Sequence, residues 1–325
     1  FSSMSVHGLA SFVPVNPDGH PVYTNAITNY QLMDGWNALL TYNKHNNRDQ
    51  HSEFATTFEA TIKLMPDLEL RGNYSFTHYN GQVINRSMNI PYSRFPEEVA
   101  YITTGIGQDR LYEKQVNHLY HAANVYASYE KSISDLHNLK LMIGGNYETK
   151  YLKDLSMSRD NLLTTELNDF ELASGELTNI NGGQNEYKIM GAFYRVNYDY
   201  NGKYLIESSG RLDGSSRFMP GHRFGFFPSA SAGWRLSEEQ FFSGLKSVIP
   251  NVKLRVSYGA LDNQQVGYYD YIQTINPGQT LGYSFGDGQR VPAASVSSPN
   301  ASDLTWEVVA TANLGFDFSL FKGKM

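Results

Sequence analysis

The feature that most constrains this chain is a strict alternation of apolar and polar residues over unusually long segments. In Phe54–Leu64 the large apolar residues occupy even positions, while Thr57, Glu59 and Lys63 occupy odd ones. Because successive side chains of a strand point to opposite faces, this pattern predicts a strand with one apolar and one polar face. Similar runs predict about nine strands in all, with no domain boundary, over 68–77, 139–151, 190–200, 204–213, 224–236, 252–261 and 304–318. The predicted fold class is all-β.

The length of these runs points to a membrane protein. They have roughly 10 to 15 residues each, whereas strands of globular proteins usually have about 5 to 6. A tilted strand needs about 9 to 11 residues to cross the hydrocarbon core of a membrane. No uncharged apolar run approaches the length of a membrane-spanning helix, so the pattern favours crossing by strands.

The connections between the predicted strands also alternate in length. Short turns are expected at Pro66-Asp67, 134–138, Asn201-Gly202 and Lys322-Gly323, and long polar segments near 80–115, 153–184 and 263–302. Short turns at one end and long loops at the other are typical of antiparallel outer-membrane barrels, although 216–223 is a short member of the long class. Residues 1–49 have no clean period and are expected to be mostly loop.

The amino-acid composition excludes further classes of protein. The chain has 26 Lys and Arg against 32 Asp and Glu, and this net charge of −6 excludes the strongly basic balance of a general nucleic-acid binder. It has no Cys, which excludes a disulfide framework and thiolate metal sites. Aromatic residues make up 14% of the chain, and 23 of them are Tyr. Those near predicted strand ends fit the aromatic girdles of membrane barrels, namely Tyr194, Tyr198, Tyr200, Tyr204, Trp234 and Trp306.

Two connections carry helical signals. Ser237-Glu238-Glu239-Gln240 has the form of a capping box, and apolar residues follow at helical spacing before Pro250 ends the run. We expect a short amphipathic segment packed under this turn. A second loop helix is expected, on weaker grounds, within Asp160–Leu172.

The sequence predicts no catalytic residue, no cofactor site and no metal site. His118 and His121 are three residues apart, which on a strand places them on opposite faces, so they cannot share a metal ion. No nucleophile-elbow, P-loop or zinc-protease motif is present. The adjacent pair Glu238-Glu239 does not by itself give two converging carboxyl groups, as glycoside hydrolysis requires.

A minority of the aromatic residues lies in the predicted loops and forms the candidate substrate-binding set. Aromatic faces stack on the apolar faces of sugar rings, and nearby amide and carboxylate groups, such as those of Asn263, Gln264, Gln265, Asp270 and Gln273, can bond sugar hydroxyls. The alternative is that these rings only pack the loops. The candidates are Trp36, Tyr268, Tyr269, Tyr271, Tyr283 and Phe285.

Charged residues opposite the apolar faces form a third group. On a soluble sandwich they would face water, whereas in a barrel they face the lumen, where cross-strand ion pairs support the wall or line a channel. We favour wall support over substrate contact. The group consists of Arg195, Arg211, Asp213, Arg217, Arg235, Lys253 and Arg255.

Several blocks of the chain, in order, resemble the SusC/RagA family of TonB-dependent outer-membrane transporters. The resemblance covers residues 187–320 closely, and residues 1–180 in character only. Asp262 stands where the family usually has Gly before Asn263. The blocks are Tyr194–Tyr200, Lys203–Leu205, Arg211–Phe218, Phe227–Arg235, Glu239 with Phe241 and Phe242, Lys253–Gly259, Asn263, Leu304–Glu307 and Asn313–Phe318.

The resemblance implies a place in a transporter of the bacterial outer membrane. It implies a 22-stranded antiparallel barrel closed by an N-terminal plug, a SusD-like lipoprotein lid, and energy from a TonB complex. Family substrates are mostly oligosaccharides, with oligopeptides in some members. Residues 1–325 are then expected to be an internal part of the barrel domain that lacks the plug and the TonB-contacting segment.

Two other functions remain open from the residues alone. A barrel enzyme of the outer membrane would need an acid, base and nucleophile cluster, and the sequence offers no such set. A soluble β-sheet module that binds glycans without transport would have to bury the apolar stripe of Leu304–Phe318 inside the molecule.

Overall fold

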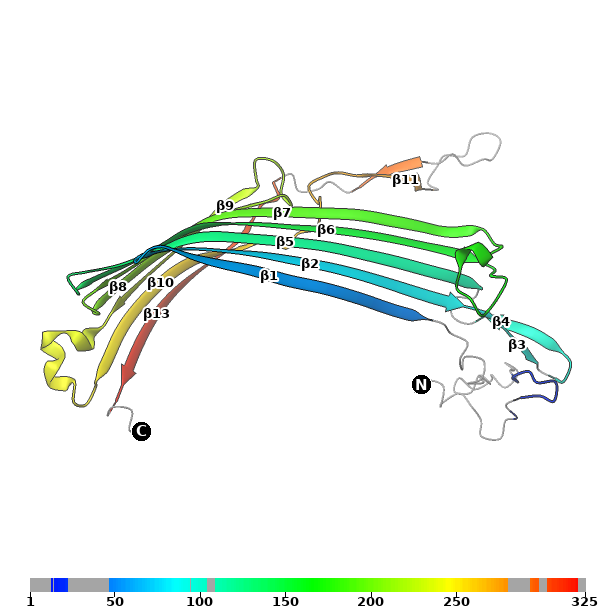
Figure 1. Cartoon of the computed structure of the whole chain (residues 1–325), viewed down its shortest axis with the longest axis horizontal. Helices are drawn as coiled ribbons and strands as arrows, with labels where there is room; N and C mark the ends of the chain where they lie inside the picture. The colour runs from blue at the N-terminus through cyan, green and yellow to red at the C-terminus, as the bar shows by residue number, and fades with distance from the viewer. Residues whose placement is uncertain are drawn as a thin grey trace. The chain divides into compact units, whose positions relative to one another are not determined.

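The computed structural model describes residue 13 and residues 15–22, 47–93, 95–103, 109–279, 293–297 and 303–320. These residues form antiparallel strands joined by turns and by a few short 3₁₀ segments (Figure 1). Among them, no helix is both long and apolar enough to pass through a bilayer. The predicted all-β class is confirmed.

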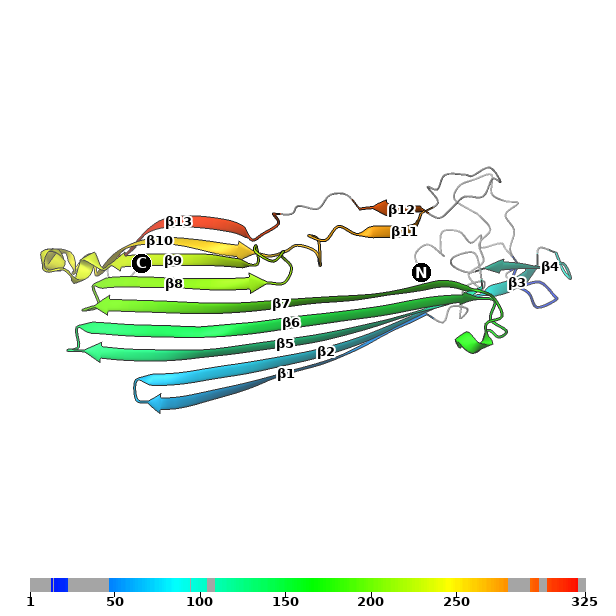
Figure 2. The ribbon, with the colours of Figure 1, turned by 90° about the horizontal axis from the view of Figure 1, so that it is seen from above.

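Within the described residues, nine strands form one sheet in the order β1-β2-β5-β6-β7-β8-β9-β10-β13 (Figure 2). The predicted number of about nine wall strands agrees with this sheet. Two small hairpins, β3-β4 and β11-β12, lie in the long connections. The bounds are β1 Arg48–Met65, β2 Leu68–Ser87, β3 Asn89–Ser93, β4 Val99–Thr103, β5 Arg110–Ile133, β6 His137–Asp160, β7 Leu177–Tyr200, β8 Tyr204–Ser215, β9 Phe224–Trp234, β10 Asn251–Asn263, β11 Ile275–Gln279, β12 Ala293–Val296 and β13 Glu307–Ser319.

Several strands are longer than the alternation predicts. β5, β6 and β7 have 24 residues each, and they extend deep into the segments 80–115 and 153–184, for which the sequence predicts loops. Ladder hydrogen bonds join backbone groups and do not require apolar side chains. The apolar pattern therefore marks only the part of each strand that faces an apolar medium, and it does not reveal the polar continuation of the strand.

The turns at the other end match the prediction. Asn201 and Gly202 both have positive φ, 52° and 65°, as the primed hairpin turn requires. Ser134 and Asp135 adopt the same conformation, with φ of 55° and 53°, although neither is glycine or asparagine. Pro66 and Asp67 form the expected turn between β1 and β2, while Lys322-Gly323 lies outside the described residues.

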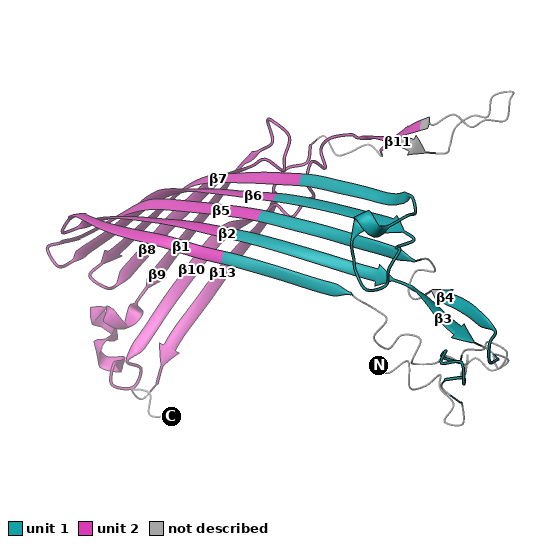
Figure 3. Ribbon diagram, turned by 45° about the vertical axis from the view of Figure 1, so that its right-hand side comes forward, with its two compact units in different colours: residues 1–54, 78–118, 152–184 teal, residues 55–77, 119–151, 185–325 magenta. Residues whose placement is uncertain are grey.

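The chain divides into two compact units (Figure 3). Unit 1 is residues 1–54, 78–118 and 152–184, and unit 2 is residues 55–77, 119–151 and 185–325. Unit 1 contains β3-β4, on which the segment 15–22 is docked: Val22 pairs with Ser93, and the Asn16 amide donates to Ser93 Oγ at 2.8 Å.

In unit 2 the strand register separates two faces. Tyr198 is opposite Ile206 across β7 and β8, and Val256 of β10 is opposite both Ala232 and Leu314. These residues belong to what we call the apolar face. Its large side chains are exposed, including Met190, Tyr194, Ile206, Leu212, Phe224, Phe226, Val256, Tyr258, Val308, Leu314, Phe316 and Phe318.

A row of aromatic rings borders the apolar face at the end where the short turns lie. Tyr200 stacks on Tyr204 at 6.2 Å between ring centroids, and Tyr204 stacks on Trp234 at 6.3 Å. The His137 ring lies 4.9 Å from Tyr200, and its Nδ1 is 2.7 Å from the hydroxyl of Tyr198. We call Tyr198, Tyr200, Tyr204 and Trp234 the ring row.

Trp306 does not belong to this row, and the expected apolar stripe from Leu304 onward is wrong at its first two members. β13 begins at Glu307, so Leu304 and Trp306 lie outside the strand. Trp306 is 6% exposed and packs at 5.4 Å edge-on to Phe227 and at 5.1 Å to Phe218, with Leu304 beside them. Burial against these rings overrides the alternation that places Trp306 in the stripe.

The two helical predictions differ in outcome. The connection between β9 and β10 contains two 3₁₀ segments, η3 Leu236–Glu238 and η4 Gln240–Leu245. The capping box is wrong, because Ser237 lies inside η3 and neither segment has a side-chain cap. In Asp160–Leu172 the helix is only one turn, η2 Phe170–Leu172, whose start is capped by Asp169.

Candidate functional site at the loop ends of the strands

Tyr268, one of the predicted loop candidates, is held in a cluster of aromatic rings around Arg217. The guanidinium carbon of Arg217 lies 4.9 Å from the centroid of the Tyr268 ring and 4.5 Å from that of Tyr187. The two rings are 6.1 Å apart, and Arg217 also donates to the backbone oxygen of Val266 at 2.6 Å. We call Arg217, Tyr187 and Tyr268 the arginine–tyrosine cluster. A guanidinium over aromatic faces is a favourable contact that fixes both partners.

The cluster brings together one strand and two connections of unit 2. Tyr187 belongs to β7, Arg217 to the turn between β8 and β9, and Tyr268 to the segment that follows β10. The Tyr187 hydroxyl donates to Glu148 of β6 at 2.7 Å. The Nε atom of Arg217 is buried and has no hydrogen-bond partner among the described residues. The sequence predicts Arg217 as a wall charge, whereas in the structure it braces the loop that carries Tyr268.

Tyr269 is the candidate that the loop presents most openly. Its side chain is 42% exposed, its φ is +60°, and its hydroxyl donates weakly to the backbone oxygen of Glu186 at 3.4 Å. A positive φ at a tyrosine is uncommon and is retained only where surrounding contacts impose it. Here the Gly267 amide donates to the Asp270 carboxylate at 2.7 Å and closes the turn around Tyr269. Tyr271 is half-buried on the same connection.

The other predicted aromatic candidates, Trp36, Tyr283 and Phe285, lie outside the described residues. Of the described candidates, the structure places Tyr268 in contact with the distant side chains of Arg217 and Tyr187, and Tyr269 and Tyr271 lie on the same connection. Tyr187 and its partner Glu148 are not among the predicted site residues. The only sequence signal for Arg217 is its position in the block Arg211–Phe218.

The polar residues expected beside these rings are mostly used by the loop itself. The Asn263 amide donates to Glu307 at 2.8 Å, and its carbonyl accepts from the Gln265 backbone amide at 3.0 Å. Gln273 donates to the backbone oxygen of Ser297 at 3.3 Å. The Gln264 carbonyl is buried and has no partner in the described part of the chain. These contacts make the loop a structured platform rather than a set of free side chains.

An aromatic core lies beneath this platform. Phe218 is fully buried, and it packs with Phe227 and Trp306. The Trp306 indole donates to the backbone oxygen of Arg223 at 2.8 Å. This core joins the turn between β8 and β9 to the chain entering β13, so it positions the loop end of unit 2.

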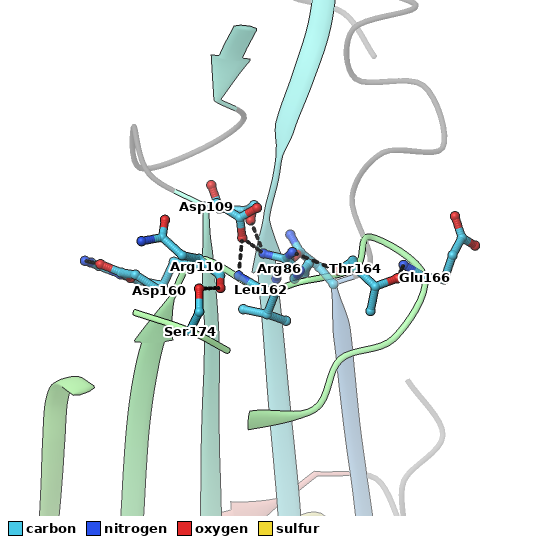
Figure 4. Close-up of polar contacts among 11 residues, drawn as sticks. Arg86, Asp109, Arg110, Asp160, Leu162, Thr164, Glu166 and Ser174 are labelled. Atoms are coloured by element: carbon cyan, nitrogen blue, oxygen red, sulfur yellow. Dashed lines mark hydrogen bonds and ion pairs between the residues drawn. The ribbon is translucent and has the colours of Figure 1, made fainter. Parts of the chain in front are cut away.

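Unit 1 has its own brace, built from a buried ion pair (Figure 4). The side chain of Arg86 is fully buried and pairs with Asp109, whose side chain is 10% exposed. Arg86 also donates to the backbone oxygen of Thr164 at 3.4 Å, and Asp109 accepts from the Leu162 amide at 3.4 Å. This pair therefore fixes the start of the connection between β6 and β7 to the end of β2.

A second ion pair lies next to it. Arg110 donates to both carboxylate oxygens of Asp160, at 2.5 and 3.0 Å. Asn161, at φ +57°, donates its amide to the Asp109 backbone oxygen at 2.9 Å and accepts from Ser174 at 2.9 Å. Figure 4 shows these side chains converging from neighbouring strands and from the connection after β6. Apart from Arg86 Nε, which is buried without a hydrogen-bond partner among the described residues, these groups bond to one another and to the backbone of the connection, so the cluster is a scaffold for loops.

The polar face of unit 2, opposite the apolar face, carries charged side chains that pair within a strand and across neighbouring strands. Arg211 donates to both oxygens of Asp213, at 2.8 and 3.0 Å, and to Asn146 at 3.0 Å. Gly191 provides the space, because a Cβ there would overlap with Asp213 Oδ1. Arg255 pairs with Asp317 at 3.1 Å, and Arg195 lies 3.8 Å from Glu207. These contacts fit the predicted wall support.

The polar face also has a hollow near the turn ends of unit 2, with a volume of about 1080 Å³. Charged side chains line it, among them Glu130, Lys140, Glu207 and Arg255. Such a lining suits water and polar solutes.

The two neighbouring histidines of β5 point to different partners, as predicted. In unit 1, His118 stacks on Tyr79 at 5.2 Å. In unit 2, His121 packs at 5.1 Å on Phe76 and its Nδ1 lies 2.7 Å from the Tyr74 hydroxyl. In the described part of the chain, no three His, Cys, Asp or Glu residues are grouped so that they could hold a metal ion.

Comparisons with known proteins agree with this architecture. The family model described as TonB dependent receptor-like, beta-barrel matches residues 7–324. The TonB-dependent receptor P39 of Formosa agariphila is 32% identical over 287 residues, which are 85% of this chain and 25% of that protein. The TonB-dependent receptor SusC of Bacteroides thetaiotaomicron is 30% identical over 212 residues, 62% of this chain and 20% of that protein.

Solved structures show the same fold. The RagAB peptide importer in its closed-closed state has a TM-score of 0.74 at 19% identity, covering 95% of this chain and 32% of that chain. Its open-open state has a TM-score of 0.74 and covers 92% of this chain and 30% of that chain. The chain spans about a quarter of the length of the curated relatives P39 and P3 of Formosa agariphila.

Proposed function

Because the chain belongs to the family of TonB-dependent receptor-like β-barrels, we propose that the protein containing it imports nutrients across the bacterial outer membrane. In this proposal residues 1–325 are part of one barrel domain, and the barrel is plugged and energised through a TonB complex.

The observation that carries this proposal is the two-faced sheet. Large apolar side chains are exposed on one face, with Leu314 at 84% and Phe224 at 62%, while the other face carries cross-strand ion pairs and a charge-lined hollow. In water such a face is unfavourable, because each square ångström of exposed apolar surface costs about 25 cal/mol. Against lipid it costs nothing, and the polar face then lines an aqueous interior.

For the substrate we propose an oligosaccharide, with an oligopeptide as the alternative. The platform of Tyr268 and Tyr269 offers aromatic faces at the loop end, and Tyr269 is open to solvent. Rings of this kind stack on sugar rings and also accept peptide side chains. RagAB is described as a peptide importer, and this supports the oligopeptide alternative.

We also propose a SusD-like surface lipoprotein as the partner at the loop end. The supporting observation concerns the described parts of the long connections, which contain β3-β4 and β11-β12 and are held by the arginine–tyrosine cluster and the Arg86–Asp109 pair. Preorganised loops lower the entropic cost of binding a lid. Copurification of a lipoprotein with the full-length protein tests this partner, and its absence under mild detergent contradicts it.

Uptake tests the transport function directly. The gene for the full-length protein is deleted, and growth and uptake are measured on single glycans and on defined peptides. We expect loss of uptake for one substrate class, restored by the intact gene. Normal uptake of every glycan and peptide contradicts the proposal.

The platform is tested by Tyr269→Ala in the full-length protein. Loss of one stacking ring is expected to weaken substrate binding by about 2- to 12-fold, since such contacts contribute about 0.5–1.5 kcal/mol. Tyr269→Phe keeps the ring and should bind normally. Tyr258→Ala, on the apolar face, is the matched control. Unchanged titration curves for Tyr269→Ala would remove Tyr269 from the site.

The two alternative functions predict different behaviour. A soluble glycan-binding module would be recovered without detergent, and recovery of the full-length protein in the soluble fraction contradicts membrane import. A barrel enzyme would convert its substrate, so chemical change of the glycan by the purified protein favours that alternative.

A further inference from the structure

The connection between β9 and β10 differs from its neighbours at the same end of unit 2. The neighbouring turns at 66–67, 134–136 and 201–203 are tight hairpin turns, whereas this connection covers 235–250 and contains η3 and η4. We call residues 239–248 the 3₁₀ turn. It is longer than a tight turn between two antiparallel strands requires.

A single carboxylate fixes the position of the 3₁₀ turn. Glu239 accepts from the Tyr204 hydroxyl at 2.7 Å, from the Trp234 indole at 3.1 Å and from Lys203 Nζ at 3.3 Å. The side chain of Glu239 is 15% exposed, so these contacts are partly shielded from water. Charged acceptors make stronger hydrogen bonds than neutral ones.

The partners of Glu239 decide on which side of the wall the 3₁₀ turn lies. Tyr204 and Trp234 both belong to the ring row and stack on each other at 6.3 Å. The ring row borders the apolar face, because Tyr204 and Trp234 are cross-strand partners in line with Ile206 and Ala232. Through Tyr204 and Trp234 the start of the 3₁₀ turn is therefore tied to the ring row at the border of the apolar face, and Lys203, the third partner, belongs to the neighbouring turn between β7 and β8.

The 3₁₀ turn exposes apolar side chains there. Phe241 is 69% exposed, Leu245 52% and Val248 44%, whereas Phe242 is half-buried, so the expectation that this segment packs under the turn is wrong for three of its four apolar residues. Polar side chains alternate with them: Ser243 is exposed, and Lys246 donates to Glu238 at 2.9 Å. The segment is amphipathic, and within the described residues its apolar members pack against no large cluster.

The ring row indicates what covers these side chains. In membrane barrels, aromatic rings at strand ends lie at the level of the lipid headgroups, and short turns lie on the periplasmic side. Amphipathic segments with Phe and Leu on one face and Lys on the other bury their apolar face about 5–10 Å into the headgroup boundary. We propose that the 3₁₀ turn is a membrane-interface anchor that inserts Phe241, Leu245 and Val248 into the periplasmic leaflet.

A bilayer fits this surface better than a protein partner does. Glu239 holds the start of the turn against Tyr204 and Trp234, the two rings that this proposal assigns to the interface, and the exposed Phe241 follows two residues later in the chain. Such an anchor fixes the height of β9 and β10 in the membrane, because both strands are joined directly to it.

Spin labels measure the depth of the turn. The 325 residues contain no Cys, so single cysteines are introduced as Phe241→Cys, Leu245→Cys and Ser243→Cys into the full-length protein, freed of any other cysteine. The labelled proteins are placed in phosphatidylethanolamine–phosphatidylglycerol vesicles. Collision rates with O₂, which concentrates in lipid, and with a water-soluble nickel chelate are then compared. We expect O₂ to dominate at 241 and 245, and the nickel chelate at 243. Equal access of the nickel chelate to all three positions overturns the proposal.

The Glu239 contact and the identity of the neighbour need two further measurements. Glu239→Ala should release the turn and raise nickel access at 241 severalfold, whereas Glu238→Ala, which removes only the contact to Lys246, should not. A photoreactive benzoylphenylalanine at position 241 should form adducts with lipid in cells. Adducts with a periplasmic protein, or with a second copy of the chain, contradict the membrane anchor. Neither outcome bears on nutrient import.

Discussion

The buried guanidinium of Arg86 shows what a single residue contributes to the loop end of unit 1. It is fully buried and neutralises Asp109, which in turn holds the Leu162 amide. Removing one partner of such a pair leaves an uncompensated buried charge and costs about 3–5 kcal/mol. The pair therefore holds the connection between β6 and β7 in place, and we expect this connection to become more mobile when the pair is lost.

We expect Arg86→Met to speed hydrogen exchange of the amides in 160–175 by at least about 100-fold, since each 1.4 kcal/mol is tenfold. Mass-detected exchange of the full-length protein in detergent measures it. Arg195→Met is the control, because its contact with Glu207 is at 3.8 Å and both side chains are partly exposed, so it should cost under about 1 kcal/mol. Unchanged exchange in Arg86→Met would mean that the pair does not hold the loop.

Glu239 makes the 3₁₀ turn sensitive to pH. Its pKa is held below 4.5, first by the hydrogen bond from Tyr204, then by that from Trp234, with Lys203 adding a smaller effect. Because the folded pKa is lowered, the charged contacts stabilise the turn above pH 4.5, and this stabilisation is lost as the pH falls through the folded value.

A spin label at position 241 should therefore be immobilised at pH 7 and gain mobility only when the pH falls through the lowered pKa of Glu239, well into the acid range, where the carboxylate takes up a proton. Glu239→Gln keeps an acceptor and removes the titration, so its label should respond little to pH. A mobility change of equal size in Glu239→Gln would assign the response to another group.

At the scale of elements, the hairpin turns fix the register in which neighbouring strands of the sheet pair. Asn201-Gly202 adopts positive φ at both positions, as does Ser134-Asp135. Positive φ suits glycine and costs other residues roughly 1–2 kcal/mol each. The first turn is therefore nearly free of strain, whereas the second stores some.

Ser134→Gly should stabilise the full-length protein by up to about 1–2 kcal/mol, and Gly202→Val should destabilise it by at least as much. Urea unfolding in vesicles measures both. Gly244→Ala is the control, because Gly244 has no positive φ and no neighbouring atom within 4 Å of the place that a Cβ would take, so it should change stability little. Destabilisation by Ser134→Gly would show that its side chain matters more than its backbone.

The length of each strand is a second feature of the element scale. β7 has 24 residues but pairs with β8 only over Ile189–Tyr200. The apolar pattern of β7 covers the same range, 190–200, because only there does the strand have an apolar face. The ends of a strand are thus set by backbone hydrogen bonding, and the alternation of apolar and polar side chains predicts only part of its length.

At the scale of the whole chain, the apolar face and the two edge strands, β1 and β13, determine whether the isolated chain stays soluble in water. β1 and β13 end the order of the nine-stranded sheet in the described residues, and the exposed apolar side chains have no protein cover there. Unpaired strand edges and an apolar surface promote association between chains.

The 325-residue chain expressed alone in water is expected to aggregate rather than fold as a monomer. Size-exclusion chromatography and light scattering measure this, with the same chain refolded into detergent as the control. A monodisperse, folded species in water would contradict the interpretation of the apolar face as lipid-facing.

The sequence alone determined the all-β class, the two faces, the turns and the resemblance to outer-membrane transporters. It could do so because period-2 alternation and positive-φ turn residues are local properties of the chain. Only the tertiary structure decided which side chains meet. Arg217, predicted as a wall charge, contacts the Tyr268 ring instead. Trp306, predicted in the apolar stripe, is buried, and Phe241, predicted to pack under the turn, is exposed. These contacts join residues far apart in the chain, so they depend on packing, which no local pattern records.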